Sequence, residues 1–256
     1  MSREQDIVAA TALLVEARRS GRPAPASGAL WADADAAYAV QDGVATAMGW
    51  TSGGGAARHW KSGGPSRQAV LTHAALPPEA VWESPARASN WPFHLRGIEA
   101  EIALRLARDV DPAQAAALGQ DGSAALVDAM CVSIEVVDSR WAEGLDAPAL
   151  AKLADLQSHG ALVLGDWVPF APPDWSRQRC VVQIGDRPPV EHVGSHSLAD
   201  PLHGLAGWLR HATRHGASVR AGTVLTTGTW VGILHSAPGD LVRAEFPGIG
   251  RASVQL

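Results

Sequence analysis

The chain has 256 residues, 46% of them hydrophobic and 18% charged, a composition typical of a globular protein that can bury a substantial core. Its formal net charge of -5 argues against a broad nucleic-acid surface, since phosphate binding needs clustered Lys and Arg. No apolar run approaches the ~20 residues that cross a bilayer, and the first residues lack the apolar segment of a signal peptide, so we expect a cytoplasmic protein that binds neither nucleic acid nor a membrane.

Two helices are expected near the start of the chain. Residues 4–19 place apolar side chains at helical spacing, and Gly21 ends the pattern. Asp33 can cap a second helix that continues to about Met48. A glycine-rich stretch then breaks the periodicity, and from His59 the chain is expected to leave helix for a strand or a loop. We therefore expect a small helical N-terminal region over residues 1–75.

From about residue 95 the pattern changes to short runs typical of β-strands, separated by Gly, Pro and Asp. Cys131 and Cys180 lie in these apolar runs and are expected to be reduced core thiols. Many short strands with few helices indicate an α+β domain with a rolled or barrel-like sheet over residues 76–256. The expected strands are 98–106, 130–137, 161–164, 180–184, 223–227, 241–246 and 252–256.

Two helices are expected to interrupt these strands. One covers either Asp111–Leu118 or Ser123–Met130, and the sequence leaves both positions open. The other covers Asp200–His215, where apolar residues share one face and Gly216 supplies the C-terminal stop.

Two acids stand at alternate positions of the first long strand. Glu99 and Glu101 leave the same face, because successive side chains of a strand point to opposite faces. Two adjacent carboxylates repel each other, which raises the pKa of one unless a cation compensates. A hard divalent ion such as Mg²⁺ or Mn²⁺ prefers oxygen ligands and would compensate. The alternative is a solvated edge strand that carries two acids.

A third acid, Glu135, lies in the apolar run 131–137, where a charge is costly unless it is paired or ligated. We therefore expect it to converge with the first two acids on one metal ion. Asp138 and Arg140 follow closely and are expected to form a structural ion pair near the end of the strand.

Five motifs then occur in order along the chain. They are Gly97–Ala103, Ile134–Arg140, Ala154–Gly165, Arg220–Gly228 and Ala237–Phe246. In this order they resemble the 2-keto-4-pentenoate hydratase / 4-oxalocrotonate decarboxylase branch of the fumarylacetoacetate hydrolase superfamily. The resemblance spans roughly residues 36–256, and an ordered set is far more specific than any single motif.

The resemblance implies a mixed β-sandwich or roll of the fumarylacetoacetate hydrolase C-terminal type, with Mg²⁺ or Mn²⁺ held by Glu99, Glu101 and Glu135. It also implies that Lys61, which follows a tryptophan, reaches the substrate, where partial burial and a lowered pKa would favour proton transfer. An exposed surface lysine is the alternative. The candidate catalytic residues are Lys61, Glu101 and Ser158.

The candidate substrate-binding residues are Lys61, His94, Asp155 and Thr229. Asp155 begins the sequence Asp-Leu-Gln-Ser, where the hydratases usually have Asp-Asn-Ala-Ser. Thr229 ends a stretch that follows a strand and precedes a turn, so its hydroxyls and amides can bind a substrate carboxylate. Ordinary turn chemistry explains this stretch equally well.

The histidines allow several interpretations. His94, His159 and His235 are candidate acid/base groups, or else structural histidines held by hydrogen bonds. His192 and His196 have a four-residue spacing that on a helix would suit a metal, but the glycine between them makes a helix improbable. We therefore expect no zinc site there.

The resemblance implies a metal-dependent lyase, a hydratase or decarboxylase, that acts on a short unsaturated 2-oxo or 2-hydroxy-dienoic acid from aromatic degradation. A metal chelated by the 1-carboxylate and 2-oxo oxygen would stabilise an enolate. The alternatives are a C–C hydrolase of acylpyruvates and a non-catalytic subunit that partners a catalytic paralogue. The resemblance also implies a homo-oligomer, with a complex with a related subunit as a further expectation.

Overall fold

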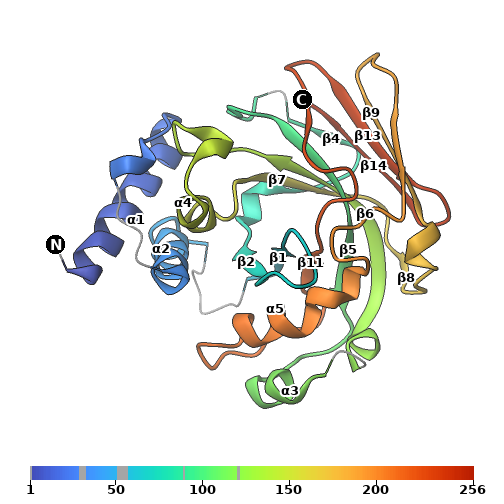
Figure 1. Ribbon diagram of the computed structural model, residues 1–256, viewed down its shortest axis with the longest axis horizontal. Coiled ribbons are helices and arrows are strands. Elements are labelled where there is room, and N and C mark those ends of the chain that lie inside the picture. The colour runs from blue at the N-terminus through green and yellow to red at the C-terminus, as the bar shows by residue number, and fades with distance from the viewer. Residues whose placement is uncertain (1, 29–32, 51–56, 89, 120–121) are drawn as a thin grey trace.

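The computed structural model describes residues 2–28, 33–50, 57–88, 90–119 and 122–256 (Figure 1). The α-helices are α1 (Arg3–Ser20), α2 (Ala34–Ala47), α3 (Pro112–Ala117), α4 (Ala149–Ala154) and α5 (Leu205–Ala212). The strands are β1 (His59–Gly63), β2 (Thr72–Ala75), β3 (Val81–Glu83), β4 (Ala86–Arg87), β5 (Gly97–Leu106), β6 (Val127–Val137), β7 (His159–Leu164), β8 (Val168–Pro169), β9 (Arg179–Ile184), β10 (Val190–Val193), β11 (Val224–Thr226), β12 (Leu234–His235), β13 (Leu241–Phe246) and β14 (Gly250–Gln255).

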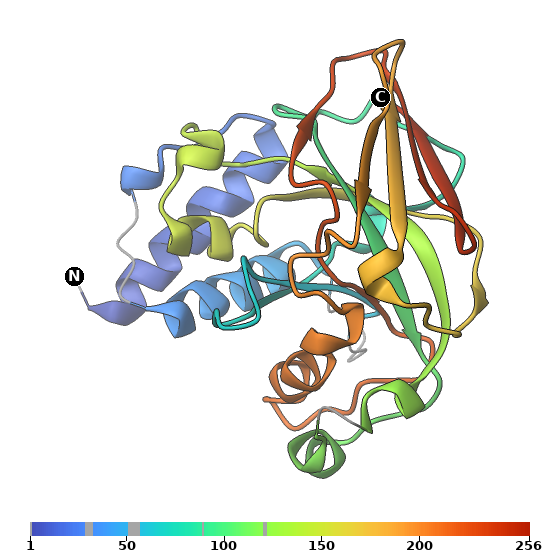
Figure 2. The same ribbon diagram turned by 45° about the vertical axis from the view of Figure 1, so that its right-hand side comes forward.

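The N-terminal helices begin and end as the sequence predicts. Ser2 and Gln5 form a capping box at the start of α1, and Gly21 ends the helix in the left-handed conformation with a φ of 67°. Asp33 caps α2 by accepting a hydrogen bond of 2.8 Å from the amide of Ala36. Helices α1, α2 and α4 lie together on one side of the molecule, around a core of their own (Figures 1 and 2).

Two curled sheets form the rest of the molecule. The nine-stranded sheet has the order β2-β1-β11-β5-β6-β7-β3, with β12 added to β5 and β8 added to β6, and the five-stranded sheet has the order β10-β9-β13-β14-β4. The largest core cluster joins residues of β5 and β6 with residues of β9, β13 and β14, so the two sheets pack face to face. This arrangement confirms the predicted α+β class with a sandwich or roll and a helical N-terminal part.

The alternation of β5 places its acids away from this core. Ile98, Ala100 and Ile102 belong to the core between the sheets, whereas Glu99 and Glu101 leave the opposite face. The nine-stranded sheet therefore turns its apolar face to the second sheet and its acidic face toward the helical part of the molecule.

Several predicted boundaries differ from the structure. Strand β1 lies where the chain was expected to leave helix for a strand or a loop, and with β2 it falls within residues 1–75. The two strands pair with each other, and β1 pairs with β11 of the large sheet. Short-range patterns could not reveal the pairing of β1 with β11, because it joins residues far apart in the chain. Of the two positions left open for the first interrupting helix, α3 occupies Asp111–Leu118, while Ser123–Met130 holds a 3-10 turn and the start of β6. The second interrupting helix, predicted over Asp200–His215, is shorter in the structure. A 3-10 turn covers Pro201–Gly204, and α5 begins only at Leu205.

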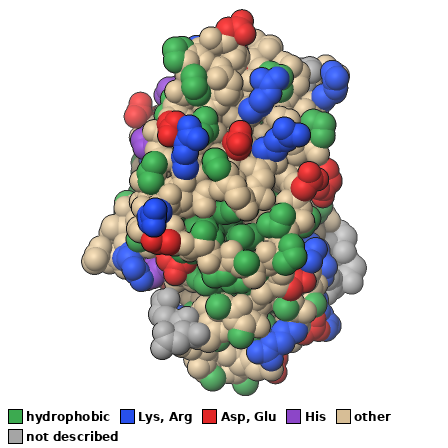
Figure 3. Space-filling model, turned by 90° about the vertical axis from the view of Figure 1, so that its right-hand side faces the viewer, with side chains coloured by type: hydrophobic (Ala, Val, Ile, Leu, Met, Phe, Trp, Pro, Cys, Tyr) green, Lys and Arg blue, Asp and Glu red, His purple; other side chains and the backbone are tan. Residues whose placement is uncertain are grey.

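The face that carries β8 and β9 shows a band of hydrophobic side chains between scattered charged ones (Figure 3).

Cys131 and Cys180 are both buried free thiols, as predicted. In the described part of the chain, no helix combines the length and the hydropathy that a membrane span requires.

Candidate metal and substrate site

The three predicted acids meet on the acidic face of the nine-stranded sheet. Glu99 of β5 stands directly opposite Glu135 of β6, and Glu101 lies two residues further along the same face of β5. One carboxylate oxygen from each residue lies within 4.8 Å of the others. Among the described residues, this is the one group of three or more acids, histidines or cysteines close enough to share a metal ion.

Burial and mutual repulsion perturb the acids of β5. Glu101 is 2% exposed and Glu135 is fully buried. Burial, followed by the charge of Glu135, raises the pKa of Glu99 well above its usual range. The same two causes raise the pKa of Glu101 to about 7, although the Thr226 hydroxyl and the Gly228 amide donate hydrogen bonds to its carboxylate.

Glu135 is instead held as a carboxylate. Burial opposes its charge, but the ammonium of Lys61 and the ring of His159 outweigh burial and lower its pKa. Lys61 Nζ donates to Glu135 Oε1 at 2.5 Å, and His159 Nδ1 lies 3.0 Å from the same oxygen. The second oxygen, Glu135 Oε2, is buried and has no hydrogen-bond partner.

Lys61 reaches this group from β1, where it pairs with Thr226 of β11. Its pKa is raised, because the charges of Glu135, Glu99 and Glu101 outweigh the desolvation that burial imposes. The lowered pKa that we expected from burial is therefore wrong for the protein without a metal. Lys61 lines the same cavity as Glu99 and Glu101, and it contacts Glu135 directly, so its predicted reach toward the substrate stays a prediction.

The residues of the site fit a divalent cation. With all three carboxylates ionised, one ammonium would leave two negative charges uncompensated, and Glu135 Oε2 is an acceptor without a donor. All three candidate ligands are hard oxygen donors, which Mg²⁺ and Mn²⁺ prefer. One divalent ion would satisfy the free acceptor and balance the charge.

A left-handed turn forms the next part of the site. Leu156, Gln157 and Ser158 have φ angles of 53°, 56° and 58°, which are rare for residues other than glycine. The carbonyl of Gln157 accepts a hydrogen bond of 3.3 Å from Lys61 Nζ. Ser158 Oγ is buried without a partner and lines the cavity. Its predicted catalytic role stays a prediction, and Gln157 is a cavity residue that the sequence analysis missed.

The cavity has a volume of about 650 Å³ and two walls of different origin. The sheet wall carries Lys61, Glu99 and Glu101. The helical wall is formed by α4 and the turn before it, together with one residue of α2: Ala34, Leu145, Ala149, Leu150, Lys152 and Leu153. Helix α4 is in turn held by α2, because Gln41 Nε2 donates to the carbonyl of Leu153 at 2.6 Å.

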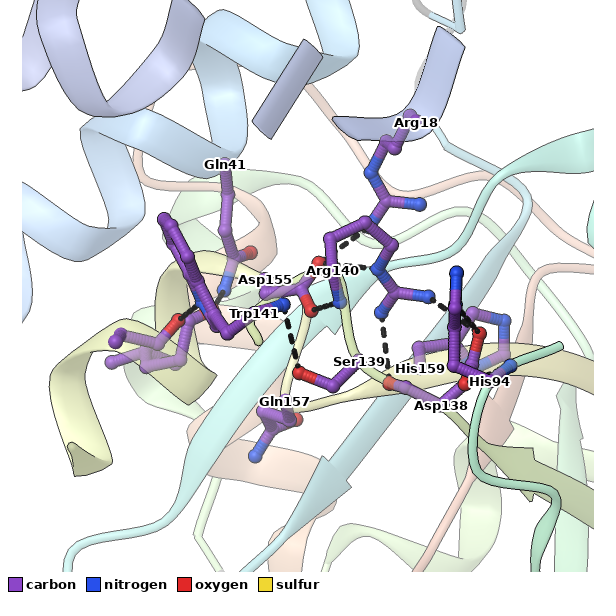
Figure 4. A network of polar contacts seen from close by, with 12 residues as sticks. Arg18, Gln41, His94, Asp138, Ser139, Arg140, Trp141, Asp155, Gln157 and His159 are labelled. Atoms are coloured by element: carbon purple, nitrogen blue, oxygen red, sulfur yellow. Dashed lines mark hydrogen bonds and ion pairs between the residues drawn. The ribbon is translucent and has the colours of Figure 1, made fainter. Parts of the chain in front are cut away.

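Asp155 does not line the cavity, which contradicts its predicted role in substrate binding. It is fully buried between two guanidinium groups (Figure 4). Arg18 Nη2 and Arg140 Nε donate to its Oδ1 at 2.9 and 2.8 Å, and the amide of Arg140 donates to its Oδ2. The predicted ion pair between Asp138 and Arg140 is present at 3.7 Å. This network joins α1 to the end of β6 and is structural.

His94 also lies outside the cavity, contrary to its predicted role as a substrate-binding residue. Its backbone amide donates to Asp138 Oδ1 at 2.9 Å, and its ring contacts Asp138 and the carbonyl of Gly21. The local sequence places His94 near the strand of the acids, but the chain directs the ring toward the helical part instead. His235 is exposed on β12.

The remaining candidates are Thr229 and the paired histidines. Thr229 lines the cavity, but its hydroxyl already donates to the carbonyl of Gly232 at 2.9 Å, as turn chemistry predicts, so its contact with substrate stays a prediction. His192 is exposed on β10, whereas His196 is buried and its Nε2 lies 3.0 Å from the carbonyl of Thr227. These two histidines belong to no metal-binding group in the described part of the chain.

Two curated proteins share part of the sequence. The chain is 28% identical over 167 residues to a 2-keto-4-pentenoate hydratase of Paraburkholderia xenovorans (strain LB400) and, over the same length, to 2-keto-4-pentenoate hydratase 3 of Pseudomonas putida. The aligned part is 64% of this chain and spans about 60% of the length of each relative.

Solved structures share the whole fold. A 4-oxalocrotonate decarboxylase from Pseudomonas putida G7, complexed with calcium and acetate, matches with a TM-score of 0.79 at 19% identity, over 100% of this chain and 98% of the other. A fumarylpyruvate hydrolase from Pseudomonas aeruginosa, in complex with Mn²⁺ and pyruvate, matches with a TM-score of 0.53 at 14% identity, over 77% and 88% of the two chains. Residues 55–256 match the Fumarylacetoacetate (FAA) hydrolase C-terminal family, and the chain therefore belongs to this family.

Proposed function

We propose that the chain is a divalent-metal-dependent lyase, a hydratase or decarboxylase, that acts on a short unsaturated 2-oxo or 2-hydroxy-dienoic acid. The observation that carries this proposal is that three acids converge beside Lys61, with Glu99, Glu101 and Lys61 lining one cavity. The named activities of the hydratase relatives and of the structurally similar decarboxylase support it.

Glu99, Glu101 and Glu135 would hold the ion, and their oxygen ligands favour Mg²⁺ or Mn²⁺. Structures that share the fold were solved with calcium, magnesium or Mn²⁺, which supports a divalent ion in this chain. When bound, such an ion supplies electrostatic stabilisation for the negative charge that develops on the 2-oxo oxygen of the substrate.

The residues of the chain itself would orient the substrate and move protons. Lys61 presents an ammonium group to the cavity, where it can neutralise a substrate carboxylate or exchange a proton with the substrate. The Ser158 hydroxyl, which has no partner in the protein, can donate a hydrogen bond to the same substrate.

The C–C hydrolase alternative has less support, because the curated relatives are named hydratases and the structure with the higher TM-score is a decarboxylase. None of the described residues lining the cavity is a histidine, so neither hydrolysis nor hydration would use a histidine that faces the cavity to activate water. His159, which pairs with Glu135, is fully buried. The alternative of a non-catalytic subunit is disfavoured by the retention of all three acids beside Lys61.

We further propose that the protein is a cytoplasmic homo-oligomer. The two buried free thiols support a reducing compartment. The hydrophobic band on one face supports contact between copies of the chain (Figure 3).

The test is to purify the chain alone, remove metal with EDTA and re-add Mg²⁺ or Mn²⁺. Absorbance would follow the loss of a 2-hydroxy-dienoate, and release of CO₂ from a 4-oxalocrotonate-like acid would distinguish decarboxylation from hydration. We expect turnover only with added metal, and its loss in Glu99→Gln. The control is Glu191→Gln, which changes an exposed acid on β10. Full activity without metal would overturn the proposal, and metal-dependent turnover of acylpyruvates alone would favour the hydrolase.

A further inference from the structure

Two buried hydroxyls flank Glu101 on the acidic face of the nine-stranded sheet. Ser133 of β6 is its direct cross-strand partner, and Thr226 of β11, which pairs with Ala103 of β5, approaches from the other side. Directly paired residues, and residues two apart along a strand, share one face of a sheet, so both hydroxyls lie on the face of the acids. Both residues are fully buried, and neither lines the cavity.

The two hydroxyls and the carboxylate form a chain of hydrogen bonds that runs in one direction. The Thr226 hydroxyl donates to Glu101 Oε2, and Ser133 Oγ lies 3.0 Å from Thr226 Oγ1. An ionised carboxylate only accepts, and a hydroxyl has a single proton to donate. When Glu101 is ionised, as a metal ligand must be, the Thr226 proton is committed to Glu101, and Ser133 therefore donates to Thr226.

The other buried acid of the site, Glu135, is also held through one of its oxygens. Lys61 Nζ donates to Glu135 Oε1 at 2.5 Å, and His159 Nδ1 lies 3.0 Å from the same atom, whereas Oε2 has no hydrogen-bond partner. In both acids, neighbouring side chains thus fix one carboxylate oxygen. A carboxylate held in this way cannot turn freely to give a cation both of its oxygens.

We propose that Thr226, supported by Ser133, is a positioning residue that fixes the Glu101 carboxylate so that it gives a bound divalent ion one oxygen. This inference rests on the proposed function, because the ion is the one proposed there. One oxygen from each acid favours Mg²⁺, which demands a strict octahedron, over Ca²⁺, which accepts more oxygens and often both of one carboxylate. The two hydroxyls would therefore contribute to the choice of ion without touching it.

The experiment measures the affinity of the metal-free chain for Mg²⁺ and for Ca²⁺ by calorimetry, at one pH and one ionic strength. Thr226→Val keeps the shape of the side chain and removes the hydroxyl. We expect its Mg²⁺ affinity to fall about tenfold, as is usual when a group that orients a ligand is lost, and its Ca²⁺ affinity to fall about twofold. Because both ions displace the same proton from Glu101, the ratio of the two affinities is independent of the protonation of this acid.

Thr227→Val is the matched control. Thr227 is also buried, but its hydroxyl donates to the carbonyl of Ile102 at 2.8 Å rather than to a carboxylate. This variant should lose stability and keep both metal affinities within about twofold. Thr226→Ser restores the hydroxyl and should restore the preference for Mg²⁺. Ser133→Ala should shift the ratio toward Ca²⁺ by less than Thr226→Val, because Thr226 keeps its own bond to Glu101.

Three results would overturn the inference and leave the proposed function intact. They are an unshifted ratio in Thr226→Val, an equal shift in Thr227→Val, and a failure of Thr226→Ser to restore the preference for Mg²⁺. Should Thr226→Val not fold, Ser133→Ala decides, since a shift toward Ca²⁺ supports the inference and an unshifted ratio overturns it. Binding of neither ion to the unchanged protein would overturn the proposed function and the inference with it.

Discussion

Two charge clusters lie near the end of β6, and they differ in the balance of their charges. In the network around Asp155, the charges of Arg18 and Arg140 match those of Asp138 and Asp155, and none of these four residues lines the cavity. In the site around Glu135, three carboxylates face one ammonium, and two of them line the cavity. Charge imbalance next to a cavity, more than buried charge itself, therefore marks the place where a ligand is needed.

The largest expected effect is a loss of stability when the charge-balanced network around Asp155 loses its shared carboxylate. Asp155→Asn leaves Arg18 and Arg140 buried without their shared carboxylate, and we expect the free energy of unfolding to fall by about 3–5 kcal/mol. Urea denaturation measures this change. Asp128→Asn, at an exposed pair with Arg105, is the control and should cost about 0–1 kcal/mol. Equal costs for the two variants would refute the structural reading of the Asp155 network.

The next largest effect is a loss of turnover at the site formed by the three acids and Lys61. Lys61→Met removes the one ammonium that contacts the acids, and we expect kcat to fall about a hundredfold or more while the fold persists. Mg²⁺ should bind no more weakly, because a neighbouring positive charge has been removed. Steady-state kinetics and a Mg²⁺ titration test both statements. An unchanged kcat would exclude Lys61 from the chemistry.

A third prediction uses the raised pKa of Glu101, which is about 7 against an ordinary 4.5. The folded protein holds this proton more tightly than the unfolded chain, so stability without metal falls as pH rises from about 4.5 through about 7. In EDTA at pH 8, Glu101→Gln should therefore be more stable than the unchanged protein by about 1–3 kcal/mol. This gain in the free energy of unfolding of Glu101→Gln should vanish near pH 4.5, where the carboxyl of the unchanged protein is protonated in the folded state.

The matched measurement adds Mg²⁺ at pH 8. The unchanged protein should then gain stability, and Glu101→Gln should gain less, because one ligand charge is missing. If Glu101→Gln destabilises the metal-free protein at pH 8, the three acids do not repel one another as described.

The smallest effect concerns the left-handed turn. Ser158→Ala removes a hydroxyl that has no partner in the protein, so the melting temperature should stay unchanged while KM rises about fivefold. Ser139→Ala is the counterpart in the balanced network, since Ser139 Oγ accepts from the amide of Trp141. That variant should lose stability and keep its KM. An unaltered KM in Ser158→Ala would place Ser158 outside the substrate site.

Local patterns predicted the parts of the site that follow from strand geometry. The alternation of Glu99 and Glu101 is a property of β5 alone, and the apolar run around Glu135 identifies a buried charge. The direct pairing of Glu99 with Glu135 depends on the register of two strands that are separated in the chain, which no local pattern gives. The convergence of the three acids was therefore inferred from the cost of a buried charge at Glu135 and from the family resemblance.

The predictions that failed also depend on contacts between residues far apart in the chain. Asp155 and His94 lie near the site in the sequence, but long-range contacts with Arg18 and Asp138 decide where their side chains point. Gln157 was missed because three successive residues in the left-handed region have no local sequence signal when none is glycine. The rise in the pKa of Lys61 depends on the number of carboxylates around it, which no spacing rule provides.

The helical wall of the cavity has a consequence for how such enzymes can diversify. The family match begins at residue 55, yet α2 contributes Ala34 to the cavity and holds α4 through Gln41. The helical wall therefore depends both on α4, within the family match, and on the support of α2, which precedes it. Exchange of the first fifty residues between relatives would change this support, and with it the shape of the cavity, while the three acids keep their places on the sheet.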